Sequence, residues 1–221
     1  MNLRTVAVVL MLVGAGCASK GSQAQSKVDA VVGDIQDVKT SVEAAHKEMM
    51  ATIKALEPVT TADSATLRPA FDKFTEHLDS LDSHVAAARG HAAGIAAQRD
   101  AYIKHSQEKA AAITNPEMKA QAEKRRAEFA ESIMVLNGKG QEVRKAFAPM
   151  QASLQDCRAV LEADMTPAAA ASLKSELENL KKMNAALDGP VREFTAALDE
   201  ASARLKPPVP PPAAPPAEPK K

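Results

Sequence analysis

A repeating pattern of apolar residues runs through most of this chain and restricts its possible folds more than any other feature. From Val28 onward, apolar side chains recur at alternating steps of three and four residues. This spacing aligns them along one side of a helix that packs against other helices. A helix over the first stripe should end at Glu57-Pro58, because the residue before a proline is disfavoured in the helical region. The first stripe consists of Val28, Val31, Ile35, Val38, Val42, Ala45, Met49, Ile53 and Leu56.

Three further stripes follow, and each is separated from the one before by a helix stop or start signal. The second runs from Phe71 to Tyr102, the third from Ala122 to Leu161 and the fourth from Leu173 to Leu205. Asn115-Pro116 separates the second from the third, and Thr166-Pro167 supplies a hydroxyl N-cap with proline in the first turn. Capping candidates for the second helix are Asp63, Ser64 and Thr66. Gly138, Gly140 and Pro149 should soften or kink the third helix.

The short connections between the stripes determine how the helices are arranged. Helices joined by short loops must be antiparallel neighbours, and the longer ones should reach about 70 Å. The sequence therefore predicts an all-α fold, an elongated antiparallel four-helix bundle or coiled coil that forms one domain over residues 28–205. Aromatic residues make up only 3% of the chain and there is no tryptophan, which suits helices packed through small side chains.

The N-terminus has the order of a secretory signal peptide over residues 1–16. Arg4 precedes an apolar run, Thr5–Val13, that is too short to span a bilayer. Small residues then lead to Cys17, and this boundary resembles a bacterial lipobox. The resemblance implies lipidation of Cys17, with residues 17–27 as a linker. Because Ala18 follows Cys17, the resemblance favours anchorage at the periplasmic face of the outer membrane over the inner membrane. The alternative is ordinary secretion with an incidental cysteine.

The chain ends in a proline-rich segment, residues 206–221, for which we expect no folded structure. Proline at this density favours the extended polyproline II conformation. The segment is interpreted either as a docking ligand or arm that reaches the cell wall, or as a solubilising tail. Its final residue, Lys221, resembles the terminal lysine by which a major outer-membrane lipoprotein is joined to peptidoglycan, so covalent attachment there is a further hypothesis.

Three histidines, His77, His84 and His91, are spaced seven residues apart, and His105 continues the series after Gln98. They flank the second apolar stripe. Residues seven apart on a helix are separated by about 10 Å, too far for two to share a metal ion, so a metal site would need ligands from a second helix. We interpret the histidines mainly as a solvated edge. The alternative is a pH-responsive stripe, since histidine titrates near neutrality.

The remaining residues suggest binding or structure and no catalysis. The 28 basic and 28 acidic residues balance, which leaves no electrostatic footprint for nucleic acid. Cys157 falls within the third stripe and should be a buried, inert thiol. No nucleophile elbow, phosphate loop or Ser-His-Asp arrangement is recognised. We therefore expect no enzyme activity, no cofactor and no metal.

Two segments carry a resemblance to a known family. Residues 101–126, around the Asn115-Pro116 break, and residues 149–180, PMQASLQDCRAVLEADMTPAAAASLKSELENL, resemble the bacterial lipoprotein family of domain of unknown function 2959. The resemblance covers about residues 28–205. It implies a helical lipoprotein and transfers no catalytic residue.

From these patterns we expect a membrane-anchored periplasmic protein, a non-catalytic structural or protein-interaction rod of the cell envelope. Its partners would be the membrane, through the lipid on Cys17, and an envelope protein or peptidoglycan. The alternative is a chaperone-like or carrier module that holds apolar ligands between its helices. The alanine-rich runs between Ala86 and Ala97 argue against a wide pocket, because small side chains allow close backbone approach.

Overall fold

The computed structural model describes residues 15–205, and within the first turns of the first helix it describes the backbone alone. The described residues form helices and no strands, which confirms the all-α prediction. The helices are α1 (Ala15–Val59), α2 (Leu67–Ala111), α3 (Pro116–Ala163), the short α4 (Pro167–Ser172) and α5 (Lys174–Leu205).

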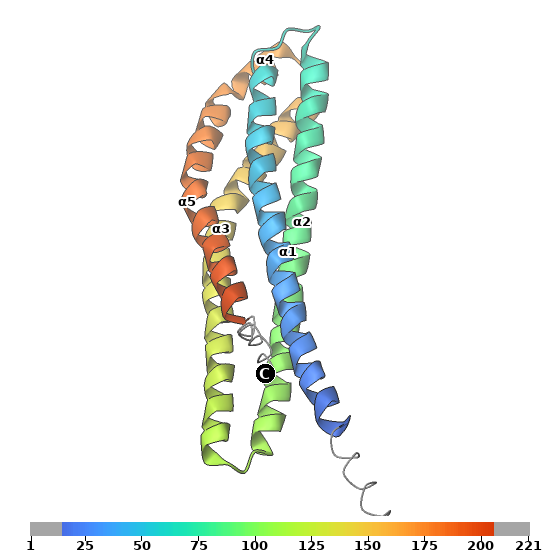
Figure 1. The fold of residues 1–221 in the computed structure, drawn as a ribbon. Coiled ribbons are helices and arrows are strands. Elements are labelled where there is room, and N and C mark those ends of the chain that lie inside the picture. Colours follow the sequence, from blue (N-terminus) through green and yellow to red (C-terminus); the bar gives the residue numbers. More distant parts are fainter. Residues whose placement is uncertain (1–14, 206–221) are drawn as a thin grey trace, which may run out of the picture.

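The four long helices lie side by side around a common interior. α1 packs against α2 and α5, and α3 packs against the same two helices. In Figure 1, α1 and α3 run upward while α2 and α5 run downward, and α4 lies at the upper end. α5 ends part of the way along α3, so the lower ends of α2 and α3 extend beyond it. The apolar stripes of all four helices therefore face one another over much of the molecule's length.

Side-chain caps explain where two of the helices, α3 and α4, begin. Asn115 accepts hydrogen bonds from the backbone N–H groups of Glu117 and Met118, at 2.9 and 3.2 Å. Thr166 accepts from Ala169 N at 3.2 Å. Each of these caps precedes a proline at the first helical position, where its missing N–H costs nothing.

The start of α2 is organised by Asp63. Its carboxylate accepts hydrogen bonds from the backbone N–H groups of Ala65 and Thr66 and from the Thr66 hydroxyl. These bonds, the one from the Thr66 hydroxyl foremost, lower the pKa of Asp63 because they favour the charged form. Thr66 itself occupies the N-cap position, yet its side chain makes no capping bond.

Three helix boundaries differ from those predicted. α1 starts at Ala15, so residues 17–27, expected to be a linker, continue the helix. It also passes through Pro58 to Val59, whose side chain is fully buried, and that burial offsets the hydrogen bond that proline cannot donate. The predicted fourth helix is divided at Leu173, where a tighter bond from its N–H to the Ala170 carbonyl ends α4.

The buried side chains form two separate cores along the bundle. The upper core surrounds the α1–α2 turn and α4, and its fully buried members include Met49, Phe74, Leu78, Leu154 and Leu180. The lower core includes Val31, Ile35, Val38, Ile95, Phe129, Ile133, Leu136, Phe194, Leu198 and Ala201. A single stripe in each helix thus contributes to two packed regions instead of one continuous seam.

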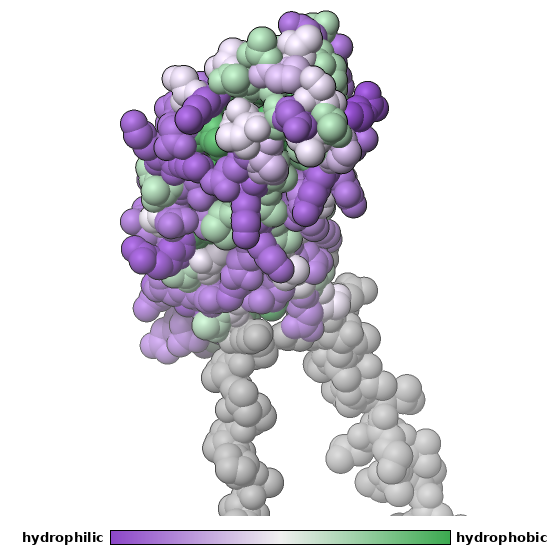
Figure 2. Space-filling model, turned by 90° about the horizontal axis from the view of Figure 1, so that it is seen from above, coloured by the Kyte–Doolittle hydropathy of each residue, from purple (hydrophilic) through white to green (hydrophobic). Residues whose placement is uncertain are grey.

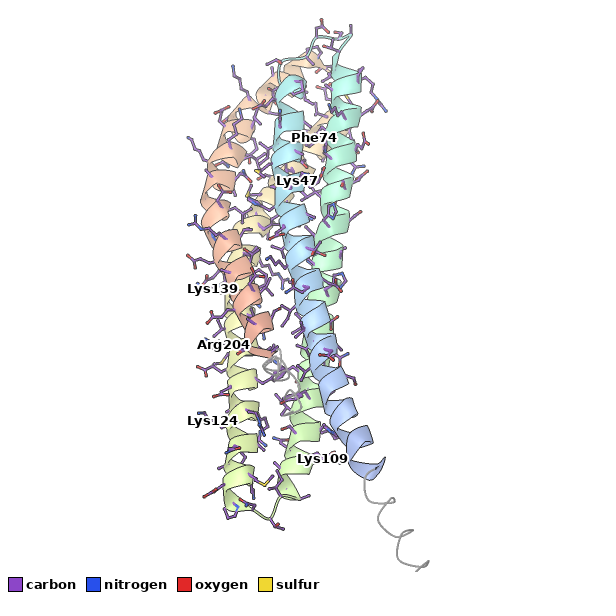
Figure 3. All side chains as sticks on the ribbon, viewed as in Figure 1. Lys47, Phe74, Lys109, Lys124, Lys139 and Arg204 are labelled. Carbon is purple, nitrogen blue, oxygen red and sulfur yellow. The ribbon has the colours of Figure 1, made fainter. Side chains whose placement is uncertain are left out.

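Charged residues cover the outside of the bundle. Lys47, Lys124 and Arg204, labelled in Figure 3, are exposed, whereas Phe74 in the upper part of the molecule is fully buried. Figure 2 views the molecule from the end that carries α4, and that face is mostly hydrophilic with small apolar patches.

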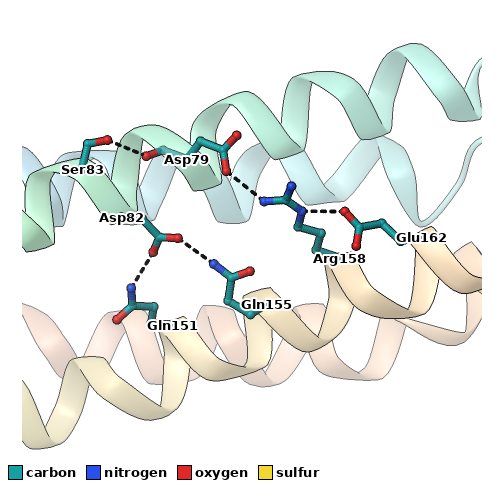
Figure 4. A network of polar contacts seen from close by, with 7 residues as sticks. All are labelled: Asp79, Asp82, Ser83, Gln151, Gln155, Arg158 and Glu162. Atoms are coloured by element: carbon teal, nitrogen blue, oxygen red, sulfur yellow. Dashed lines mark hydrogen bonds and ion pairs between the residues drawn. The ribbon is translucent and has the colours of Figure 1, made fainter.

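A polar network joins α2 to α3 beside the upper core (Figure 4). The carboxylate of Asp82 accepts hydrogen bonds from Gln151 at 2.5 Å and from Gln155 at 2.7 Å. One turn further along, Arg158 bridges Asp79 of α2 and Glu162 of its own helix, at 2.9 and 2.8 Å. The Asp82 contacts are half-buried, so they align the two helices with less competition from water.

We expect Asp82→Ala to lower the free energy of unfolding by about 1–3 kcal/mol, because two half-buried amides lose their charged acceptor. Ser83→Ala is the matched control, since the Ser83 hydroxyl donates only to the Asp79 carbonyl of its own helix. Urea denaturation of both variants measures the difference. Equal effects at the two positions would contradict a role for the network in joining α2 to α3.

Candidate functional site

The upper and lower cores are separated by a cavity of about 480 Å³. All four long helices contribute to its walls, and members of both cores line it. Its apolar lining includes Val38 and Val42 of α1, Val85, Ala88 and Ala92 of α2, Leu136, Val143 and Phe147 of α3, and Val191, Phe194 and Leu198 of α5. The cavity is therefore an interruption in the packing at the centre of the bundle.

Small residues in α2 and α3 explain why packing is interrupted there. Between Val85 and Ile95 the apolar stripe of α2 carries only Ala88 and Ala92, and Gly140 of α3 also lines the cavity. A Cβ added at Gly140 would lie 3.4 Å from the Phe194 ring, an ordinary contact distance, so glycine there is not required by crowding. The alanine-rich runs were expected to argue against a wide pocket, yet Ala88 and Ala92 line a cavity of about 480 Å³.

The cavity opens to solvent between α2 and α3. On α2, Arg89 and Ala92 are exposed although they line the cavity, and on α3 the same holds for Gln141 and Arg144. The walls contributed by Val38, Val191 and Leu198, by contrast, are buried. The cavity thus has an apolar interior and a polar mouth.

The charged groups at this site are basic. Arg89, Arg144 and His46 line the cavity, and no aspartate or glutamate of residues 15–205 does so. Within residues 15–205, no ion pair is formed by Arg89 or by Arg144, whereas other arginines, such as Arg158 and Arg204, hold carboxylates. An apolar chamber with uncompensated guanidinium groups at its mouth can accept an apolar chain and can attract negative charge.

His46 contributes a ring from α1 to the wall of the cavity. Its side chain is 17% exposed, and its Nε2 atom lies 3.0 Å from a carboxylate oxygen of Asp188 on α5. That nitrogen is buried and makes no aligned hydrogen bond, so the contact is an ion-pair distance without hydrogen-bond geometry. Neither His46 nor the two arginines lies in a sequence motif, and the absent large residues of α2 were the only available signal for the site.

The histidine stripe lies outside the cavity, and two of its members, His77 and His91, lie near acidic residues of α1. His77 contacts Glu48 of α1 at 2.5 Å, and both side chains are partly shielded, at 31% and 19% exposure. His77 is therefore not the fully solvated residue that the interpretation of the stripe as a solvated edge had predicted. His84 and His105 are half-buried, and a pH-responsive role for the stripe stays a prediction.

His91 belongs to a three-residue cluster with two acidic residues of α1. Possible ligand atoms of Asp34, Asp37 and His91 all lie within 4.8 Å of one another. Asp37 is 61% exposed and lies 3.9 Å from His91, and a Cβ at Gly94 would lie 3.0 Å from the Asp34 carboxylate. We interpret the cluster as an ion-pair contact between α1 and α2. Among the described residues it is the one place where another helix, α1, brings two carboxylates next to a histidine of α2, as a metal site would need.

Two predicted attachment points are not described in atomic detail. Cys17 falls in the first turn of α1, where only the backbone is described. Lys221 and the proline-rich residues 206–221 lie outside the described residues. Lipidation and wall attachment therefore stay predictions.

Cys157 is buried in the upper core at 1% exposure. Burial raises the pKa of its thiol from 9.0 to about 11, with Glu176 and Asp156 contributing in the same direction. The burial of Cys157 confirms the position that the apolar pattern of α3 predicted. The raised pKa favours a neutral thiol at physiological pH, and low reactivity stays a prediction.

The raised pKa of the Cys157 thiol predicts that the folded protein loses stability at alkaline pH. Unfolded Cys157 ionises near pH 9 while the folded thiol stays neutral to about pH 11, so the thiol's contribution to folding is complete below pH 9 and disappears across that interval. Relative to Cys157→Ala, we expect the native chain to lose about 2 kcal/mol more of its unfolding free energy between pH 9 and 11. Urea denaturation at both pH values measures it, and parallel pH profiles would contradict it.

The chain belongs to the family described as protein of unknown function DUF2959, whose profile matches residues 19–206. The match includes the described helices from the first turns of α1 to the end of α5. No curated protein and no solved structure matches the chain. Among the described helices, none has a stretch long and apolar enough to cross a bilayer.

Proposed function

We propose that this protein is a non-catalytic binding module of the cell envelope, a lipid-anchored antiparallel four-helix bundle that holds an apolar ligand in its central cavity. The observation that carries the proposal is the cavity of about 480 Å³ between the two cores. Small-molecule sites in proteins are clefts of about 300–1,000 Å³, lined mainly by apolar side chains with a few polar groups. The cavity has this size and this lining.

The gap that the cavity leaves in the packing, and its access to solvent, support binding as well. An unfilled volume of this size lowers stability, because the atoms around it lose packing contacts. A ligand that occupies it restores those contacts and stabilises the folded state in proportion to its concentration over its dissociation constant. Access through the gap between α2 and α3 requires no separation of the closely packed α1–α2 pair.

The groups at the cavity support binding more than chemistry. They comprise guanidinium groups, one imidazole and the side-chain amides of Asn137 and Gln141. Cys157 lies in the upper core, and burial raises the pKa of its thiol to about 11, which favours the protonated form. We infer no reaction from this set.

Filling the cavity provides a direct test. We expect Ala88→Leu together with Ala92→Leu to abolish binding of a neutral apolar fluorophore, 1-aminoanthracene, and to raise the midpoint of thermal unfolding, because the new side chains occupy the empty volume. Fluorescence titration and calorimetry measure the two effects.

Ala87→Leu together with Ala93→Leu adds the same volume to the exposed side of α2 and is the matched control. It should leave fluorophore binding unchanged. If the filled and control variants bind the fluorophore as well as the native chain does, the cavity is not the binding site.

Anchorage through Cys17 is the second part of the proposal. A lipid anchor would hold the bundle at a membrane surface, and the sequence context favours the periplasmic face of the outer membrane. Several acyl chains attach a protein firmly, because each buried methylene contributes about 0.8 kcal/mol. A structural or interaction rod anchored in the same way is the second candidate, supported by the elongated arrangement of the helices (Figure 1).

We expect Cys17→Ala to prevent incorporation of labelled palmitate and to leave the protein as an unprocessed precursor. Cys157→Ala, which removes a buried thiol, should incorporate label as the native chain does. Metabolic labelling and membrane fractionation measure both variants. Normal labelling of Cys17→Ala would exclude this residue as the lipidation site.

A further inference from the structure

We propose that the ligand of the central cavity is a single-chain anionic amphiphile, with its acyl chain among the apolar walls and its carboxylate or phosphate head between Arg89 and Arg144. This inference rests on the proposed function and specifies the ligand of the same site. It follows from the distribution of charge at the mouth, which the size of the cavity alone does not determine.

The two arginines come from opposite sides of the opening. Arg89 lies on α2 and Arg144 on α3, both line the cavity, and both are exposed at its solvent side. A guanidinium group presents several N–H donors in a planar fork that matches the oxygens of a carboxylate or phosphate. Two such groups on the two helices that flank the opening can hold one anionic head from both sides.

Within residues 15–205, no acidic side chain pairs with these arginines. Acidic residues near them on the same helices already have other partners. Asp82, about two turns from Arg89 on α2, accepts from Gln151 and Gln155. Glu142, beside Arg144 on α3, is held by Lys139 at 3.1 Å. Positive charge at the mouth is therefore left for an external anion.

The interior restricts the rest of the ligand. Most of the wall between the arginines and α5 is formed by apolar side chains such as Val85, Leu136 and Phe147, and its other polar groups are His46, Asn137 and Gln141. A ligand with polar groups along its whole length would leave most of them unpaired at a cost in free energy. A hydrocarbon chain with polarity confined to one end matches the site, and a cationic head would be repelled by Arg89 and Arg144.

The test compares probes that differ only in head-group charge. Binding of dansylaminoundecanoic acid and of its uncharged methyl ester is measured by fluorescence with the full-length chain, for the native protein and for Arg89→Gln with Arg144→Gln. We expect the acid to bind the native protein more tightly than the ester. We expect the double variant to lose about tenfold or more in affinity for the acid and none for the ester, because only the acid makes charge-assisted hydrogen bonds.

A matched control removes two positive charges from the same helices away from the cavity. Lys104 of α2 and Arg125 of α3 are exposed, do not line the cavity and form no ion pair within the described chain. Lys104→Gln with Arg125→Gln should leave the affinity for the acid unchanged. An equal loss in the control would show a general charge effect and would overturn the assignment of Arg89 and Arg144.

The possible outcomes separate this inference from the proposed function. If neither probe binds the native chain, both fail. If the ester binds as tightly as the acid, the cavity binds apolar ligands, and the anionic head group is overturned. Where the acid binds more tightly, competition by dodecanoate and by dodecyl phosphate, below their micellar concentrations, distinguishes a carboxylate from a phosphate head. Displacement of the acid by the cationic dodecyltrimethylammonium with equal potency would also overturn the inference.

Discussion

The structure depends on burial of four apolar stripes against one another, and the size of the side chains along those stripes determines what the bundle encloses. Where the stripes carry Leu, Phe, Met and Ile, the helices form dense cores. Where α2 carries Ala88 and Ala92 and α3 carries Gly140, the same geometry leaves a cavity. One constraint, the fixed spacing of helices held apart by large residues above and below, thus explains both the packing and the site.

The fold could be predicted from the sequence in its class and in most of its boundaries. Spacing of three and four residues identifies helices, and Asn115-Pro116 and Thr166-Pro167 mark starts that the structure reproduces with side-chain caps. Pro58 was misjudged, because a local preference against proline is outweighed by burial of Val59. The break at Leu173 was missed for a different reason: nothing in the local sequence distinguishes a one-residue break from a continuous helix.

The site was far less predictable. A run of alanines has two opposite consequences: it lets two helices approach, or it leaves a gap when large residues elsewhere keep them apart. Which one applies depends on residues distant in the chain, here Phe147 and Phe194 on the facing helices. The same limit affects the histidines, because their spacing identifies a helix edge, while the contact of His77 with Glu48 depends on how α1 is rotated.

The division of the apolar interior also has a consequence for dynamics. Two cores joined through a loosely filled middle need not open together, so the bundle contains two regions that can exchange their amide hydrogens with different free energies of opening. The upper region, closed by α4 and the turn at Asp63, should behave as the more persistent unit. The lower region, where α5 stops before α2 and α3 do, can fray while the upper one stays intact. Occupancy of the space between them would couple the two and make the whole bundle unfold as one cooperative body.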